Sequence, residues 1–120
     1  LVATVTATLK DGTGFEDLVR AVFPGGSITG APKRRAMELL EDLEPVPRGF
    51  YTGSLFFLDD DGSTWSSILI RSIVVAGGVA HLGAGGGVVA DSDPEGEWME
   101  SNAKARALTR VLGFVPEGAQ

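Results

Sequence analysis

The feature that most constrains the fold is an uncharged stretch of 18 residues, 73–90, in which six positions are glycine. Its length is close to the minimum for a helix that crosses a membrane. The adjacent Gly77 and Gly78 would break such a helix, whereas two glycines between short apolar runs are typical of a tight hairpin turn. The stretch therefore predicts a β-hairpin that continues into an open glycine-rich loop at 83–87.

Hydrophobic periodicity predicts the elements on either side of this hairpin. Apolar residues that alternate with threonine predict a half-buried strand at 1–9. Helical spacing predicts three helices, at about 15–23, 32–43 and 94–112. Two further strands are predicted at 53–58 and 65–75. The order of strand, two helices, antiparallel strands and helix indicates an α+β fold.

The charge balance and the lack of cysteine exclude several classes of partner and site. Sixteen acidic residues stand against ten basic ones, which gives a formal net charge of -6. This charge repels phosphate backbones and anionic lipids, so we expect neither nucleic acid nor a membrane as partner. A chain without cysteine has no disulfide, zinc–thiolate site or catalytic thiol, and it fits a location in the reducing cytoplasm.

The last predicted helix carries two carboxylates and an ammonium on one arc. Glu97, Glu100 and Lys104 fall within about 60° of one another on a helical wheel. The same arc continues into an apolar stripe of Ala107, Leu108, Val111 and Leu112. Thr109 falls on the opposite arc, which we expect to be solvated.

Two interpretations of these three charged residues remain open. If the apolar stripe faces the core, the charges point into the protein, and two carboxylates spaced i, i+3 suit a hard cation such as Mg²⁺. The alternative is a set of surface ion pairs in the first turns of the helix, and periodicity alone favours this simpler interpretation.

Arg71 interrupts a run, 68–75, that is apolar on both faces, which is typical of a strand buried in a sandwich. A buried guanidinium needs a partner of opposite charge. A carboxylate within the protein would satisfy it, or the arginine would clamp the carboxylate of a ligand. The residues alone leave both interpretations open.

Two glycine-rich segments, 25–30 and 83–87, offer backbone N–H donors that no side chain blocks. Neither has the spacing of a dinucleotide-binding or phosphate-binding motif. Taken singly, each segment is explained by turn formation, and binding of a small anion is the alternative.

Four motifs, in this order along the chain, resemble the chorismate-binding enzymes. They read FPGGSITGAPK at 23–33, IR at 70–71, AGGGVVADSDP at 84–94 and EWME at 97–100. The resemblance covers essentially the whole chain. Within the family, the form of the first motif resembles component I of the aminodeoxychorismate synthases. Anthranilate synthases, which typically have GTLSG at this place, are the alternative, and a binding module without catalytic activity is a further one.

The resemblance implies roles for particular residues. It places Mg²⁺ on Glu97 and Glu100, and chorismate on Ser27, Tyr51, Arg71, Gly85, Gly87 and Lys104. Among the substrate contacts, it implies that the arginine clamps the carboxylate of the enolpyruvyl side chain with help from the tyrosine. The two glycines lie at the same carboxylate, and the serine lies near the ring.

The activity that the resemblance implies is Mg²⁺-dependent amination of chorismate at C4 to 4-amino-4-deoxychorismate, a transferase or lyase step toward para-aminobenzoate and folate. A glutamine amidotransferase subunit or domain would supply the ammonia. The nucleophilic lysine of the family lies upstream of the motifs found here. We therefore expect the chain itself to hold no catalytic residue.

Family members are several times longer than this chain, which begins at Leu1 inside a strand-like pattern. We therefore expect 1–120 to be the C-terminal part of a chorismate-binding domain whose N-terminal part is absent. The resemblance implies a layered α/β sandwich with two stacked antiparallel sheets. Dividing such a fold exposes strand edges and core faces, so we expect the isolated chain to be inactive and to self-associate.

Overall fold

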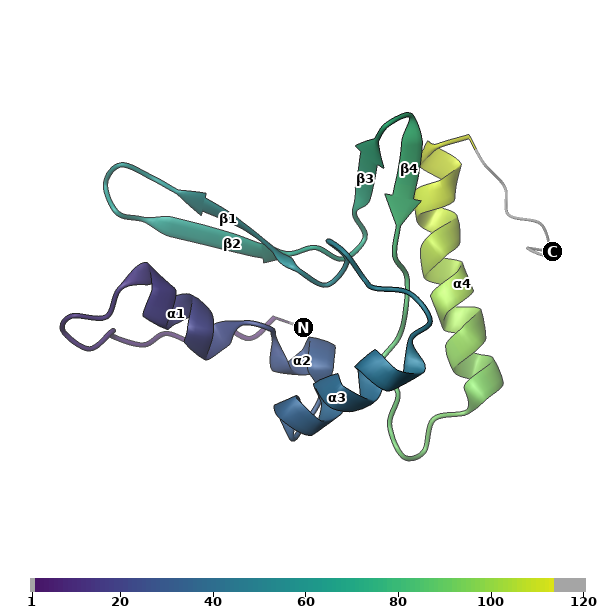
Figure 1. Cartoon of the computed structure of the whole chain (residues 1–120), viewed down its shortest axis with the longest axis horizontal. Helices are drawn as coiled ribbons and strands as arrows, with labels where there is room; N and C mark the ends of the chain where they lie inside the picture. The colour runs from purple at the N-terminus through teal and green to yellow at the C-terminus, as the bar shows by residue number, and fades with distance from the viewer. Residues whose placement is uncertain (1, 114–120) are drawn as a thin grey trace.

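The computed structural model describes residues 2–113 and contains helices and two short antiparallel hairpins (Figure 1). The elements are α1 (Phe15–Val22), α2 (Gly26–Thr29), α3 (Lys33–Leu43), β1 (Ser54–Leu58), β2 (Thr64–Ile68), β3 (Ile73–Ala76), β4 (Val79–Leu82) and α4 (Pro94–Val111). The predicted α+β class is confirmed. No helix in the described part of the chain is long and apolar enough to cross a membrane.

The ends of the helices follow local sequence signals. The Asp93 side chain accepts a hydrogen bond from the backbone N–H of Gly96 at 2.8 Å, and Pro94 occupies the first turn of α4. Helix α3 begins one residue later than predicted, because Pro32 lies at the N-cap. The single turn α2 was not predicted, since four residues are too few to show a helical period.

Both hairpins pair as their turns require. In the first, Phe57 lies opposite Trp65. In the second, Gly77 and Gly78 have φ angles of 58° and 78°, which is the conformation of the predicted two-residue turn. The ring of Phe56 meets that of Phe15 edge to face, with 5.4 Å between ring centroids, and this contact attaches α1 to β1.

Two predicted strands are wrong. The strand predicted at 65–75 is interrupted, because β2 ends at Ile68 and β3 begins at Ile73. Between them Arg71 has a φ of 51°, a left-handed conformation that does not continue a strand. Residues 2–9 are exposed and form no strand. Their alternating pattern defines two faces, but a strand also needs a neighbour for its backbone hydrogen bonds, and no described segment provides one.

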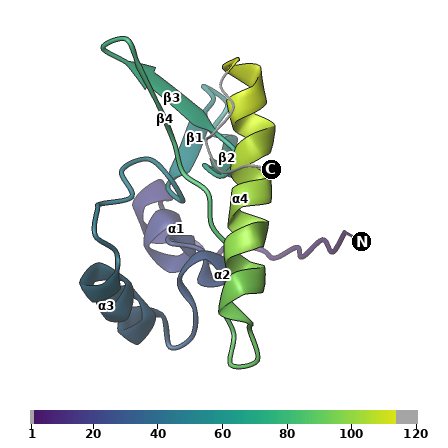
Figure 2. The same cartoon turned by 90° about the vertical axis from the view of Figure 1, so that its right-hand side faces the viewer.

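The arrangement leaves most apolar side chains accessible to solvent. The accessible surface is 10189 Å², whereas a compact protein of 12.5 kDa exposes about 6,200 Å². Hairpin β1–β2 extends away from hairpin β3–β4 and from α4 (Figure 1), and β3–β4 leans away from α4 in the second view (Figure 2). Leu55, Phe57 and Trp65 on the face of this hairpin opposite Phe56 are each more than 60% exposed. The chain therefore presents an open apolar face.

The burial of α4 also differs from the prediction. Thr109 is the one buried residue of the described chain, whereas Val111 of the predicted stripe is 79% exposed. Helix α4 lies beside the glycine-rich loop in both views (Figures 1 and 2), and its half-buried residues include Glu97, Lys104 and Leu108. No described element covers the rest of the stripe.

Candidate functional site

Helix α4 brings an ammonium and two carboxylates to the glycine-rich loop. Lys104 Nζ donates hydrogen bonds to the carbonyl oxygen of Gly85 at 3.1 Å and to Glu100 Oε1 at 2.5 Å. Ser92 Oγ donates to Glu97 Oε1 at 2.6 Å and accepts the backbone N–H of Val89 at 3.0 Å. Each charged group is therefore held by a second group beside it.

The two carboxylates converge on Gly86. A Cβ atom at this position would lie 2.7 Å from Glu97 Oε2 and 3.7 Å from Glu100 Oε1. The loop can pass this close to the carboxylates because residue 86 has no side chain. The surface ion pair of the simpler interpretation does exist, between Lys104 and Glu100, but it lies against this loop.

This donor set fits part of a Mg²⁺ site. Carboxylate oxygens are the ligands that Mg²⁺ prefers, and the ion commonly takes one or two of them together with water and substrate oxygens. Within residues 2–113 no group of three or more acidic or histidine side chains could hold a metal ion. Glu97 and Glu100 could therefore supply two ligands for such an ion, and any others would come from water, a bound molecule or another part of the protein.

Tyr51 contacts the same loop from the other side. A Cβ atom on Gly83 would lie within 2.6 Å of the ring carbons Cδ1 and Cδ2 of Tyr51, and one on Gly85 would lie 3.1 Å from the phenol oxygen. The ring therefore rests directly on the backbone of the loop. Its hydroxyl lies next to Gly85, the residue whose carbonyl accepts the Lys104 ammonium.

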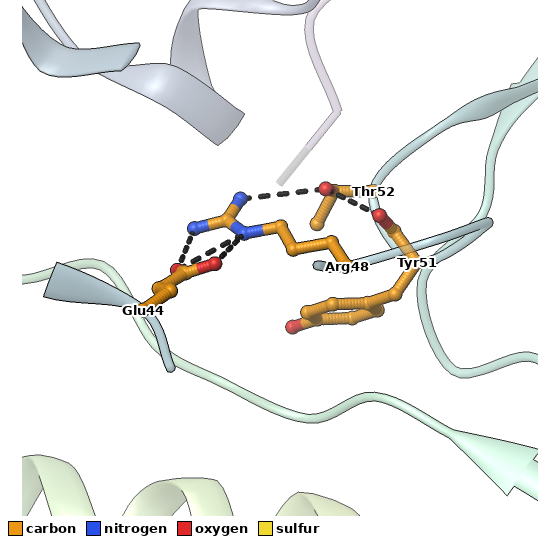
Figure 3. A network of polar contacts seen from close by, with 4 residues as sticks. All are labelled: Glu44, Arg48, Tyr51 and Thr52. Atoms are coloured by element: carbon orange, nitrogen blue, oxygen red, sulfur yellow. Dashed lines mark hydrogen bonds and ion pairs between the residues drawn. The ribbon is translucent and has the colours of Figure 1, made fainter. Parts of the chain in front are cut away.

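A polar network holds the segment that carries Tyr51 (Figure 3). Arg48 Nε donates to Glu44 Oε2 at 2.7 Å, and Nη2 donates to Glu44 Oε1 at 2.5 Å. Arg48 Nη1 donates to Thr52 Oγ1 at 3.3 Å, and that hydroxyl donates to the carbonyl of Tyr51 at 2.6 Å. The hydrogen bond from Arg48 lowers the pKa of Glu44, although partial burial opposes the shift.

Sequence reasoning missed this network. Its only signal is an acidic residue four positions before an arginine, and such spacing is usually read as a pair on a helix surface. Here α3 ends at Leu43, so the pair spans the proline-containing turn that follows the helix.

Arg71 is exposed and forms neither an ion pair nor a side-chain hydrogen bond with any residue in 2–113. The predicted burial in a strand is therefore wrong, and of the two partners left open for the guanidinium, no carboxylate in residues 2–113 pairs with it. The backbone nearby is tied to the Tyr51 segment, since Thr52 N–H donates to the Leu69 carbonyl and Leu69 N–H donates to the Gly53 carbonyl, both at 2.9 Å. The charge of Arg71 is left accessible.

The structure does not bring every predicted residue to the loop. Ser27 lies exposed in the single turn α2, and no described hydrogen bond connects its side chain to the site. Around Gly87 nothing lies within 4 Å of where a Cβ atom would stand, so this end of the loop is open. The residues that contacts bring together are Tyr51, Gly85, Glu97, Glu100 and Lys104.

Two carboxylates, an ammonium, a phenol and open glycine backbone lie together at one loop of this α+β protein, and such a set of groups could bind a small polar ligand. The family model described as chorismate binding enzyme matches residues 1–110. The chain belongs to this family.

Two characterised relatives illustrate the similarity. The chain is 47% identical, over 98% of its length, to aminodeoxychorismate synthase component 1 of Bacillus subtilis. It is 42% identical, over its full length, to anthranilate synthase component 1 of Pseudomonas aeruginosa. The chain spans about a quarter of the length of these relatives, 25% and 24% respectively.

Proposed function

We propose that this chain supplies one part of the chorismate and Mg²⁺ site of an enzyme that aminates chorismate at C4 to give 4-amino-4-deoxychorismate. The observation that carries the proposal is the convergence of Tyr51, Lys104 and two glutamates on the glycine-rich loop. We prefer this product over anthranilate because residues 27–30 read SITG, the form that resembles the aminodeoxychorismate synthases. Anthranilate synthesis is the second candidate, because relatives of both names share this degree of identity.

The substrate residues would act through charge and hydrogen bonds. Chorismate is a dianion, and Arg71 offers an accessible guanidinium that no described carboxylate occupies. In the proposal it clamps the enolpyruvyl carboxylate in a bidentate pair, the phenol of Tyr51 donates to the same group, and backbone N–H groups at Gly85 and Gly87 complete the contact. Ser27 would lie near the ring.

Glu97 and Glu100 would hold Mg²⁺, which as a Lewis acid withdraws charge from an oxygen ligand of the substrate. Ser92 orients Glu97 and Lys104 orients Glu100, so both carboxylates are fixed before the ion binds. Lys104 also adds positive charge beside the position where the substrate would lie.

The remaining parts of the enzyme would come from outside this chain. We infer that an upstream part of the same protein provides the nucleophilic lysine and further metal ligands, and that a glutamine amidotransferase delivers ammonia. The activity would take place in the cytoplasm. In this proposal the isolated chain has no turnover and self-associates through its open apolar face, which includes Leu55, Phe57 and Trp65.

The proposal is tested by calorimetric titration of chorismate into the chain, with and without Mg²⁺, alone and after mixing with the upstream part of the Bacillus subtilis relative. Arg71→Ala and Glu100→Ala should each abolish Mg²⁺-dependent binding. The control is Arg34→Ala, which removes an exposed arginine paired only with Glu38. Binding that persists in both site variants would contradict the proposal. Mass analysis of the product formed by the mixture from chorismate and ammonia separates 4-amino-4-deoxychorismate from anthranilate.

A further inference from the structure

The ion pair between Glu44 and Arg48 differs from the helix-surface pairs of this chain. Its side chains are 35% and 28% exposed, whereas those of the Arg34–Glu38 pair are 47% exposed for the glutamate and 95% for the arginine. The guanidinium makes three hydrogen bonds to one carboxylate, a geometry that restricts both side chains. This pair connects the end of α3 to the turn that precedes β1.

The turn beyond Arg48 is fixed by a short series of hydrogen bonds that ends at Tyr51. Arg48 reaches the hydroxyl of Thr52, which in turn donates to the Tyr51 carbonyl, and Tyr51 N–H donates to the Arg48 carbonyl at 3.0 Å. Figure 3 shows the Arg48 side chain extending from this turn toward Glu44 and the Tyr51 ring projecting from the same turn. Guanidinium and ring thus belong to one tight turn.

Open space borders this turn. Residues 44 and 46–49 and Tyr51 line both of two cavities, of about 920 Å³ and 730 Å³. A segment beside open space lacks packing on that side. Directional polar contacts therefore add to the constraint that the contact with the loop places on Tyr51.

We propose that Glu44 and Arg48 are positioning residues that hold the Tyr51 ring on the backbone of Gly83 and Gly85. Their effect on chorismate rests on the proposed function, in which the Tyr51 phenol contacts the substrate. Neither Glu44 nor Arg48 needs to touch substrate, because their contribution is the orientation of the turn. Loss of either partner would free the turn and leave the helix α4 side of the site unchanged.

The position of the ring can be measured without any ligand, because Tyr51 is the only tyrosine of the chain. Chain produced with 3-fluorotyrosine gives one fluorine resonance, whose chemical shift reports the surroundings of this ring. Arg48→Met and Glu44→Gln should each move this resonance toward its position in urea-unfolded chain, and Arg48→Lys should move it less. Arg34→Met, which breaks the exposed pair on α3, should leave it unchanged.

A charge exchange separates positioning from general damage to the fold. The double variant Glu44→Arg with Arg48→Glu restores an ion pair of opposite direction and should return the resonance most of the way to its native shift. A native shift in both Arg48→Met and Glu44→Gln would overturn the proposal. So would an exchange variant that retains native circular dichroism but shows the same displaced signal as the single variants.

Chorismate affinity provides the second readout and separates this inference from the proposed function. If Tyr51 is the target, Arg48→Met should weaken binding by about tenfold in the native background, and by less than about twofold once Tyr51→Ala is present. Fully additive losses would overturn the positioning role. An absence of chorismate binding in every background, also after mixing with the upstream part of the Bacillus subtilis relative, would refute the proposed function, whereas the fluorine result would still decide the position of the ring.

Discussion

Replacement of Gly83 by alanine tests the contact between Tyr51 and the glycine-rich loop most directly. A Cβ atom at this position would lie within 2.6 Å of two ring carbons of Tyr51. Ring carbon Cγ would lie closer still. Ordinary van der Waals contact begins at 3.4 Å, so the ring or the loop has to retreat by more than 0.8 Å. The atoms involved belong to a rigid ring near its attachment to the backbone, so a rotamer change of a flexible tip cannot relieve the overlap.

The magnitude of the effect follows from this displacement. Insertion of a methyl group into a filled space commonly costs about 1–3 kcal/mol. A binding group displaced by about 1 Å can lose about 100-fold in function. For a ring that moves by more than 0.8 Å, we expect Gly83→Ala to weaken Mg²⁺-dependent chorismate binding by about 10- to 100-fold.

The assay combines the fluorine resonance of 3-fluorotyrosine at Tyr51 with chorismate titration. Gly87→Ala is the control for the resonance, since it adds the same methyl group to the same loop where nothing lies within 4 Å. We expect a displaced resonance in Gly83→Ala and a native one in Gly87→Ala. A native resonance and native chorismate affinity in Gly83→Ala would refute the close contact between Gly83 and the Tyr51 ring.

Three further predictions concern the other groups of the site. The pKa of Glu44 is lowered below its usual 4.5 by the hydrogen bond from Arg48, so the stabilising effect of the pair is present above pH 4.5 and is lost as the pH falls through the lowered pKa. The fluorine signal should follow this loss in the native chain but not in Glu44→Gln. Gly86→Ala should reduce Mg²⁺ affinity, measured by calorimetry, because its Cβ would lie 2.7 Å from Glu97 Oε2. Ser92→Ala should lower Mg²⁺ affinity by about tenfold through loss of the hydrogen bond to Glu97, and unchanged affinity would show that this bond does not orient the carboxylate.

The sequence predicted correctly those elements that depend only on residues near one another in the chain. The Gly77–Gly78 turn and the start of the last helix at Pro94 are as predicted, because each depends on a few neighbouring residues. The strand predicted at 1–9 is absent from residues 2–9. A strand needs a neighbouring strand for its backbone hydrogen bonds, and alternation of apolar residues does not identify that neighbour. For the same reason the sequence could not reveal that the apolar run around Arg71 is broken by a left-handed residue.

The sequence predicts the residue types of the candidate site better than it predicts the contacts that hold its side chains in place. Glu97, Glu100 and Lys104 on one helical arc indicated a cluster, and the contacts at Gly85 and Gly86 place that cluster against the loop. The Glu44–Arg48 network joins a helix end to a turn through tertiary geometry, which has no periodic signature. Helical wheels also misplaced Thr109, since burial depends on which neighbours a helix meets and not only on its own apolar stripe.

The close approach of Gly86 to both carboxylates has a thermodynamic consequence. Gly85 and Gly86 are adjacent in the backbone of the loop. The Gly85 carbonyl accepts a hydrogen bond from the Lys104 ammonium, and Gly86 lies close to the carboxylates of Glu97 and Glu100. In the proposed function, a shift of this backbone that improves the binding of Mg²⁺ therefore changes the surroundings of chorismate, and a shift that improves the binding of chorismate changes those of Mg²⁺. Cation and organic anion should then bind with a shared coupling free energy, so that Mg²⁺ changes the dissociation constant of chorismate by the same factor as chorismate changes that of Mg²⁺.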